Sequence, residues 1–269
     1  MGDKGFRVGL IGGLSFQSSN HYNKAIHEYV QQTLGGQHST ELVQVDVNFE
    51  WVVDHMEHDR WNLIGERLAS IAEVMVKSFG VEKVAIASNT IHRVASRIVD
   101  QIGSVRFLHI ADCVAQACLE EIAELNQHHS DEFAAKHARR VLLLGTEPTM
   151  SQPEIVRQRL EQQGLEIVVP KAEAQQRLHQ IIFGELCHGQ RDVDSVEWYQ
   201  RMICEAIQDN GGVAGIILGC TELSMLIDPF ALSHTKGYWE YNHDQPFVVV
   251  DSAEAHIKGI AKAYLNLNK

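Results

Sequence analysis

The sequence predicts an α/β fold with two Rossmann-like lobes, each built on a doubly wound, mainly parallel sheet. Short apolar segments rich in β-branched residues alternate with helical segments, which is the pattern of parallel strands covered by helices on both faces. The chain has 269 residues, of which 45% are hydrophobic and 22% are charged, enough for sizeable cores. The alternation also restarts past the middle of the chain, which indicates two lobes.

The expected elements follow from apolar periodicity and glycine punctuation. Residues 61–79 show the clearest helical spacing, and Gly80 ends that helix. Strands are expected at 7–11, 41–47, 83–87, 107–110, 141–144, 166–169, 213–218 and 247–250. Further helices are expected at 114–136, 154–163, 175–187, 196–209 and 253–265. An inserted loop or helix extension is expected at 128–131, and a long loop at 232–246 that covers the site, contacts another subunit or is simply solvated.

A weak internal duplication relates the Ser-Asn-Thr triplet at 88–90 to the Cys-Thr-Glu triplet at 220–222. Each triplet follows a helix, a glycine turn and a buried strand. Open α/β sheets bind ligands at the carboxyl ends of their strands, so each triplet stands where chemistry is expected. We therefore expect a pseudo-twofold arrangement with the site between the lobes, the lobes being 1–113 with 249–269, and 114–248.

The composition excludes several classes of function. A formal net charge of −12 argues against nucleic acid or an anionic membrane as a partner, because both require a basic patch. Residues 1–7 lack the pattern of a signal peptide, and no apolar run reaches the roughly 18 residues of a spanning helix. The five cysteines are odd in number and form no Cys-x-x-Cys pair, which predicts free thiols in a reducing cytoplasm.

Cys220 carries the strongest candidate chemistry. It follows an apolar strand and precedes Thr221 and Glu222, a place where a helix N-terminus and backbone N–H groups favour a thiolate. A thiol that ionises near the working pH can both take and return a proton. The alternative is a buried structural cysteine. That alternative is the expectation for the four cysteines on helical segments, Cys113, Cys118, Cys187 and Cys204.

The turn at 88–92 offers groups that hold a carboxylate. Asn89 and Thr90 provide side-chain donors, and the turn provides backbone N–H groups. A plain helix N-cap explains the same residues, and the two interpretations are compatible because an N-cap turn also binds anions. For His92, two roles stay open: tuning Ser88 or the substrate, or a capping or surface role.

The glycine pair at 12–13 ends the first strand and leads into Leu14 and Ser15. It lacks the Gly-x-Gly-x-x-Gly order of a dinucleotide site, but it lets a ligand approach the backbone closely. No metal site is expected, because His55 and His58 lack the His-Glu-x-x-His spacing.

Together these segments resemble the aspartate/glutamate racemase superfamily along almost the whole chain. The family pattern is a Gly-Gly-Met/Leu turn, a Cys-Asn-Thr-x-His segment and a Gly-Cys-Thr-Glu segment, and this chain reads Gly-Gly-Leu-Ser at 12–15, Ser-Asn-Thr-Ile-His at 88–92 and Gly-Cys-Thr-Glu at 219–222. Residues 142–150 and 181–187 are also similar. The Leu-Gly-Gly-Gln-His-Ser segment at 34–39 resembles the branch that contains the L-aspartate/glutamate-specific racemase.

The resemblance implies an isomerase that inverts Cα of aspartate or glutamate without pyridoxal phosphate or another cofactor. It implies that Cys220 and Ser88 are catalytic, and that the last strand and helix, from about Phe247, return to the first lobe. The substrate-binding residues that it implies are Gly13, Leu14, Ser15, Asn89, Thr90, Thr221 and Glu222. For partners we expect a small acidic amino acid and a second copy of the chain in a homodimer, with no nucleic acid and no membrane.

Ser88 departs from the family pattern, in which most members have cysteine at this position. A hydroxyl is a far weaker acid than a thiol, whose ordinary pKa is about 8.5. We therefore expect weak or one-sided racemisation, and the resemblance to a branch with threonine here implies selectivity for the L enantiomer. The alternatives are a one-handed, decarboxylase-like enzyme that uses Cys220 alone, and a binding protein for acidic amino acids that has lost turnover.

Overall fold

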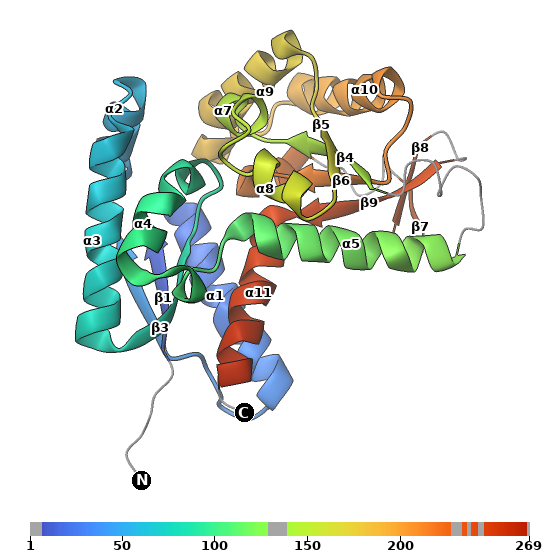
Figure 1. The fold of residues 1–269 in the computed structure, drawn as a ribbon. Coiled ribbons are helices and arrows are strands. Elements are labelled where there is room, and N and C mark those ends of the chain that lie inside the picture. Colours follow the sequence, from blue (N-terminus) through green and yellow to red (C-terminus); the bar gives the residue numbers. More distant parts are fainter. Residues whose placement is uncertain (1–6, 129–138, 227–232, 236–237, 242–244, 268–269) are drawn as a thin grey trace. The chain divides into compact units, whose positions relative to one another are not determined.

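The structure is a computed structural model that describes residues 7–128, 139–226, 233–235, 238–241 and 245–267 (Figure 1). The chain divides into two compact units. Unit 1 contains Met1–Cys113 and Ala253–Lys269, and unit 2 contains Val114–Ser252. Among the described residues, no helix is both long and apolar enough to cross a membrane.

Unit 1 holds a parallel sheet of three strands in the order β2-β1-β3. The strands are β1 (Arg7–Gly12), β2 (Leu42–Asp46) and β3 (Val81–Ile86). Phe107 adds a single parallel bridge beside Val84 of β3. The helical elements are α1 (Phe16–Leu34), α2 (Phe49–Glu57), α3 (Trp61–Phe79), η1 (Thr90–Val94), α4 (Ala95–Ile102), η2 (Ser104–Arg106), α11 (Ser252–Leu267) and the start of α5 (Ile110–His128).

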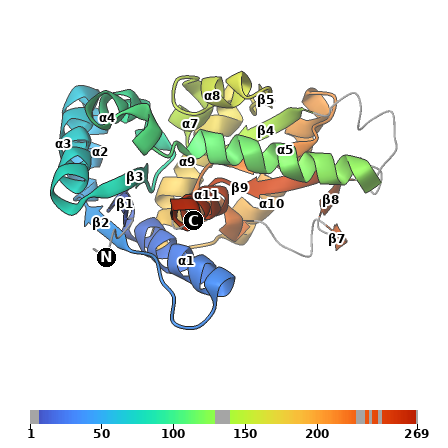
Figure 2. The same cartoon turned by 60° about the horizontal axis from the view of Figure 1, so that its bottom comes forward.

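Both faces of this sheet are buried, because successive side chains of a strand point to opposite faces. Leu10 packs in a cluster with Tyr22 of α1 and Ile257 of α11, whereas the next residue, Ile11, packs in a cluster with residues of α2, α3 and α4. Figure 2 shows α1 and α11 side by side, with α2, α3 and α4 apart from them. The doubly wound arrangement therefore follows from strands that are apolar on both faces.

Unit 2 holds a sheet of six strands in the order β5-β4-β6-β9-β8-β7. The four parallel strands are β4 (Arg140–Leu144), β5 (Glu166–Val168), β6 (Gly215–Leu218) and β9 (Gln245–Asp251). The antiparallel strands β7 (Ser233–Thr235) and β8 (Tyr238–Tyr241) extend one edge. The helical elements are α7 (Glu147–Ser151), α8 (Arg157–Gln162), α9 (Ala172–Gly184), η3 (Leu186–His188), α10 (Val193–Asp209) and η4 (Thr221–Leu226).

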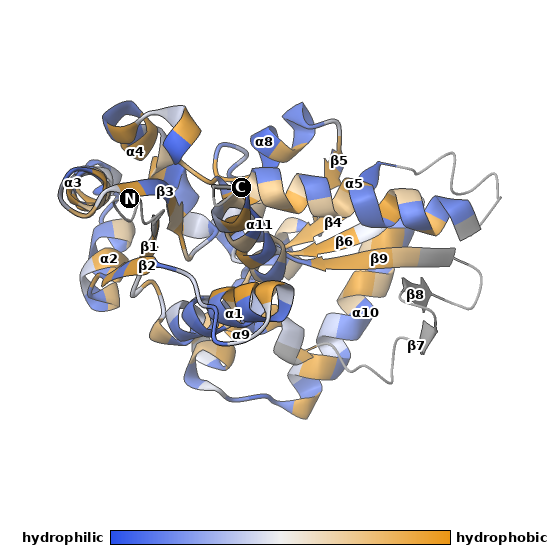
Figure 3. Cartoon of the chain, turned by 90° about the horizontal axis from the view of Figure 1, so that it is seen from below, coloured by the Kyte–Doolittle hydropathy of each residue, from blue (hydrophilic) through white to orange (hydrophobic). Residues whose placement is uncertain are grey.

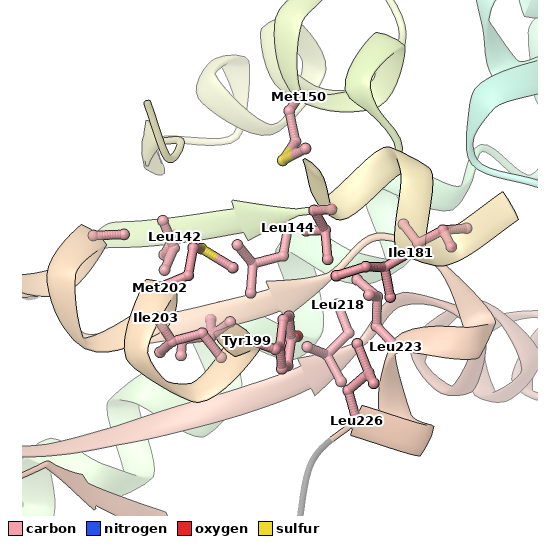
Figure 4. Close-up of a cluster of buried hydrophobic side chains, with 14 of the residues drawn as sticks. Leu142, Leu144, Met150, Ile181, Tyr199, Met202, Ile203, Leu218, Leu223 and Leu226 are labelled. Carbon is pink, nitrogen blue, oxygen red and sulfur yellow. The ribbon is translucent and has the colours of Figure 1, made fainter. Parts of the chain in front are cut away.

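The core of unit 2 forms on strands that are hydrophobic along most of their length (Figure 3). Leu142 and Leu144 of β4 pack with Leu218 at the end of β6 and with Tyr199 of α10 (Figure 4). All four side chains are at most 2% exposed, so the strand ends of this sheet are set in a close-packed core.

The two parallel sheets repeat one topology. In each, the first strand is central, the second lies on one side and the third on the other. A fourth segment then pairs with the third strand: β9 with β6 in unit 2, and the Phe107 bridge with β3 in unit 1. The α/β class and the two mainly parallel sheets predicted from the sequence are confirmed.

The structure corrects four expectations about individual elements. The strand expected at 107–110 is one bridge followed by the start of α5. The loop expected at 232–246 contains β7 and β8. Of the insert expected at 128–131, His128 ends α5 and the rest lies outside the described residues. The last strand, β9, stays with β6 in unit 2, so the division of the chain falls after Ser252 and not after Val248. The helices α1, α2, α4 and α7 were not among the expected helices.

Candidate active site

Unit 1 places two of the expected segments together at the carboxyl edge of its sheet. β1 ends in the turn at 13–15, and β3 ends just before Ser88. The backbone N–H of Ala87 donates to the carbonyl of Ile11 (3.0 Å), and the Ser18 hydroxyl donates to the carbonyl of Ala87 (3.3 Å). These bonds hold the end of β3 against both the end of β1 and the first turn of α1.

Residues 13–15 form a turn that packs against Val47 and bonds to the first turn of α1. Gly13 has a φ of 73°, and a Cβ here would collide with the backbone of Val47, so glycine is required. Its N–H donates to the hydroxyl of Ser19 (2.7 Å). Leu14 is 5% exposed, and its side chain belongs to the core. Ser15 has a φ of 96°, which is strained for a residue with a side chain, and its hydroxyl caps α1 by accepting from the Ser18 N–H (3.2 Å).

Ser88, Asn89 and Thr90 follow β3 and are half-buried. The short helix η1 begins at Thr90, and His92 lies on it with 2% exposure. A surface role for His92 is therefore wrong. Its Nδ1 lies 2.6 Å from the carbonyl oxygen of Ser88.

Unit 2 places Cys220 at the equivalent edge of its own sheet. The backbone N–H of Gly219 donates to the carbonyl of Leu144 (2.6 Å), and a Cβ at Gly219 would lie 2.6 Å from that same oxygen. Glycine is therefore needed before the cysteine, because any side chain would push the end of β6 away from β4. Cys220 is half-buried and packs against the apolar core of the unit.

The Cys220 thiol is paired with a carboxylate. Its Sγ donates to Oε2 of Glu222 (2.9 Å), and the hydroxyl of Thr221 donates to the same oxygen (2.6 Å). The triplet at 220–222 is therefore one hydrogen-bonded group in which Glu222 is the common acceptor. A carboxylate that accepts from a thiol is placed to take its proton.

The environment of this thiol differs from the expectation. Burial raises the pKa of Cys220 well above the ordinary thiol range, and the negative charge of Glu222 and its hydrogen bond with the thiol raise the pKa further. The segment that follows is the six-residue 3₁₀ helix η4, which has little of the dipole of a long α-helix. The sequence context favours a thiolate, whereas these surroundings favour the neutral thiol.

Other titratable groups share the electrostatic environment of Cys220. Burial, followed by the charge of Glu222, raises the pKa of Cys187 to about 11. Cys187 packs against the apolar core of the unit, as predicted. Its place near Glu222 is an addition for which the family similarity over 181–187 was the available signal. Tyr199 is fully buried, and burial together with the charges of Cys220 and Asp251 raises its pKa. Nothing in its own sequence context marks Tyr199 as a neighbour of the thiol.

Register pairing shows that Ser88 and Cys220 occupy equivalent places. Ile86 of β3 pairs with Ile11 of β1, and Leu218 of β6 pairs with Leu144 of β4. Ile86 and Leu218 are the last residues of β3 and β6, and the candidate catalytic residue stands two positions after each. A short 3₁₀ helix follows in both units. The duplication noticed in the sequence is therefore a structural repeat.

The remaining candidates lie away from these strand ends or serve the helices. His55 and His58 direct Nδ1 at backbone carbonyls of their own helix, at 2.8 and 2.7 Å. Within the described ranges, no group of three His, Cys, Asp or Glu side chains is arranged to hold a metal ion. Cys113 and Cys118 lie on α5, where burial raises both thiol pKa values, Cys113 to about 11.

A strand-end thiol bonded to a carboxylate can exchange a proton, and a serine stands at the matching position of the other sheet. Comparison with known proteins identifies the family. The family described as Asp/Glu/hydantoin racemase matches residues 11–260, and the chain belongs to this family.

Solved structures show the same likeness. A candidate Asp/Glu racemase from Yersinia pestis is 28% identical, with a TM-score of 0.76 and coverage of 97% of this chain and 99% of that one. An aspartate racemase homologue from Pyrococcus horikoshii is 30% identical, with a TM-score of 0.71 and coverage of 96% and 99%. The glutamate racemase of Aquifex pyrophilus is 16% identical, with a TM-score of 0.56 and coverage of 98% and 84%, and shares the fold.

Proposed function

We propose that the protein is a racemase of aspartate or glutamate that transfers protons at Cα without pyridoxal phosphate, with Cys220 as its principal acid/base. The observation that carries the proposal is the hydrogen-bonded thiol–carboxylate pair of Cys220 and Glu222 at a strand end, at the place that Ser88 occupies in the other sheet. The names of the similar structures support the substrate class, since they include an Asp/Glu racemase candidate and an aspartate racemase homologue.

The proposed reaction starts from the neutral thiol. Glu222 accepts the thiol proton, and the resulting Cys220 thiolate removes the Cα proton of the amino acid. The electron pair left at Cα is delocalised into the α-carboxylate, which requires hydrogen-bond donors to stabilise the growing charge. Asn89 and Thr90 carry suitable side-chain donors, whereas the Thr221 hydroxyl already donates to Glu222 and the Gly13 N–H to Ser19.

Reprotonation determines the product. When the Cys220 thiol returns a proton, the same enantiomer forms, carrying a solvent isotope if the thiol has exchanged with solvent. When the proton comes from Ser88, the other enantiomer forms. Glu222 then releases the thiol proton to solvent, and Ser88 recovers its own proton from solvent. Because a hydroxyl is a weak acid and its anion is costly to form, the Ser88 step is the slow one. We propose that the enantiomer deprotonated by Cys220 is L.

The test is deuterium incorporation at Cα in heavy water, followed by NMR for each enantiomer of aspartate and glutamate. The unmodified protein is expected to exchange one enantiomer quickly. Cys220→Ser, which is nearly isosteric, should lower that rate on the order of 1000-fold, because it removes the principal acid/base. Cys204→Ser is the matched control on α10 and should leave the rate nearly unchanged.

Three outcomes contradict the proposal. Cys220→Ser with most of the parent rate would show that another group moves the proton. Binding of L-glutamate or L-aspartate by calorimetry with no Cα exchange would instead identify a binding protein. Proton delivery onto an arylmalonate substrate without amino-acid exchange would identify the one-handed, decarboxylase-like reaction.

A further inference from the structure

His92 links two backbone groups that are 22 residues apart in the chain. Its Nδ1 lies 2.6 Å from the carbonyl oxygen of Ser88, and its Nε2 accepts from the backbone N–H of Ile110 at 3.2 Å. Ile110 is the first residue of α5, so the imidazole also caps this helix. One buried side chain therefore joins the end of β3 to the start of α5.

The two contacts determine the protonation state of the ring. A backbone N–H can only donate, so Nε2 has to be an unprotonated acceptor. The Ser88 carbonyl can only accept, so Nδ1 has to carry the proton. His92 is therefore neutral and in a single tautomer, and neither contact can be made with the ring flipped.

The surroundings of His92 hold the ring in place. His109 and Phe107 lie with ring centroids 4.5 and 5.8 Å away, and the ring of His256 lies 5.9 Å away. The neighbouring imidazoles have their own backbone partners: His109 Nδ1 accepts from the Ala111 N–H, and His256 donates to the carbonyl of Leu108. Burial lowers the pKa of His256 to about 4, so this neighbour is uncharged at neutral pH.

The two units hold the carbonyl of the equivalent residue differently. In unit 2 the carbonyl of Cys220 accepts from the backbone N–H of Leu223 at 3.2 Å, which is an ordinary turn of η4. In unit 1 the carbonyl of Ser88 is held by the His92 side chain. The orientation of the peptide between Ser88 and Asn89 therefore depends on the His92 side chain, which can be replaced while Ser88 and Asn89 are kept.

We propose that His92 is a positioning residue for Ser88: its Nδ1–H fixes the Ser88 carbonyl and thereby the direction of the Ser88 hydroxyl and the Asn89 N–H. This inference rests on the proposed function. A displacement of about 1 Å at a proton-transfer group costs up to two orders of magnitude in rate, so the Ser88 step should be sensitive to the loss of this bond.

Two conservative variants separate the two contacts. In His92→Asn, the side-chain amide nitrogen stands close to the position of Nδ1 and still donates to Ser88. In His92→Gln, the amide oxygen stands close to Nε2 and still accepts from Ile110. Exchange at Cα of both enantiomers reports the catalytic effect, and hydrogen exchange of the Ile110 amide reports the other contact.

The expected pattern is selective. His92→Gln should lower Cα exchange of the slow, Ser88-dependent enantiomer about tenfold or more and leave the fast, Cys220-dependent enantiomer unchanged. His92→Asn should largely restore the slow rate but lose protection of the Ile110 amide, which His92→Gln keeps. A merely structural role would lower both enantiomers together in both variants, and that result would overturn the proposal.

Failure of the proposed function has a different signature. If the unmodified protein exchanges neither enantiomer, the racemase proposal fails, and the positioning role fails with it. The tautomer remains measurable in that case: ¹⁵N NMR of the imidazole should show Nδ1 protonated and Nε2 bare at neutral pH. A protonated Nε2 would overturn the positioning role even in an active enzyme.

Discussion

The carboxyl edges of the two parallel sheets share a backbone plan and differ in chemistry. Ser88 and Cys220 each stand two residues past the last register pair of the third strand, before a short 3₁₀ helix. Beside Cys220 the structure has a carboxylate acceptor for the thiol proton, whereas beside Ser88 it has a neutral imidazole on the backbone carbonyl. A repeated fold therefore does not repeat the proton chemistry, which depends on the side chains added at each end.

The two strand ends differ most in the hydrogen-bond partners beside Cys220 and beside Ser88. Glu222 accepts hydrogen bonds from both Cys220 and Thr221, and it is the proposed acceptor of the thiol proton in unit 2. In unit 1, the proton of His92 points to the Ser88 carbonyl and its other nitrogen is occupied by Ile110. His92 is therefore placed to orient Ser88 and not to ionise it, which predicts unequal rates for the two directions.

Beyond the loss of Cys220 itself, the largest expected effect comes from placing a thiol at both strand ends. Ser88→Cys should raise Cα exchange of the slow enantiomer on the order of 100-fold, because a thiol replaces a hydroxyl as the acid/base. Exchange of the fast enantiomer should change little. The measurement is again deuterium incorporation for each enantiomer.

Two matched variants complete that experiment. Ser96→Cys adds a thiol to the exposed surface of α4 and should change neither rate. Ser88→Ala removes the hydroxyl and should abolish slow exchange alone. Equal rates for both enantiomers in the unmodified protein, or no gain from Ser88→Cys, would rule out Ser88 as the second acid/base.

A smaller effect is expected from weakening the proposed proton acceptor in unit 2. After burial, the charge of Glu222 and its hydrogen bond are the main causes that raise the pKa of Cys220. Glu222→Gln removes the charge and should lower that pKa, so at a fixed pH between 7 and 9 more of Cys220 is thiolate. Alkylation of Cys220 by iodoacetamide, followed by mass spectrometry of its peptide, should become severalfold faster.

The same variant should nevertheless exchange Cα protons more slowly at its best pH, because the acceptor for the thiol proton is weaker. Glu161→Gln, on the exposed face of α8, is the control and should alter neither measurement. Unchanged alkylation of Cys220 in Glu222→Gln would show that burial alone sets its pKa.

Much of the fold was predictable because apolar residues recur with clear strand or helix periodicity. The helix predicted at 61–79 is α3, and the strands predicted at 141–144 and 166–169 are β4 and β5 with shifted ends. The resemblance to the racemase family is confirmed by the family match across residues 11–260. The equivalence of the positions of Ser88 and Cys220 could be predicted because each residue follows a short apolar strand.

The errors arise where tertiary contacts determine the structure. The buried residues of α1 include Tyr22, Ile26 and Val30, spaced by four among many polar residues, so the apolar stripe is narrow. The strand β9 pairs with β6 of unit 2, and the order of the segments in the sequence does not predict which of the two sheets it joins. The state of Cys220 could not be predicted, because it depends on burial and on the hydrogen bond with Glu222.

The smallest expected effect compares one buried tyrosine from each unit. Tyr22 is 1% exposed, and its hydroxyl bonds to Nδ1 of His256 at 3.2 Å, with the ring proton on Nε2 donated to Leu108. Tyr199 is fully buried, and among the described residues its hydroxyl has no hydrogen-bond partner. Burying an unsatisfied hydroxyl costs free energy, whereas deleting a satisfied one strands its partner.

Replacing each tyrosine by phenylalanine should therefore give opposite signs. Tyr22→Phe leaves His256 Nδ1 without its donor and should lower the free energy of unfolding by about 1–2 kcal/mol. Tyr199→Phe should leave that free energy unchanged or raise it by up to about 1 kcal/mol, since only an unpaired group is lost. Urea unfolding of both variants at pH 7, with the m-value checked for constancy, measures the difference. A loss above about 1 kcal/mol in Tyr199→Phe would mean that the hydroxyl does find a partner in the folded protein, and Cys220 or Asp251, whose charges raise the pKa of Tyr199, would be the first to examine by a second substitution.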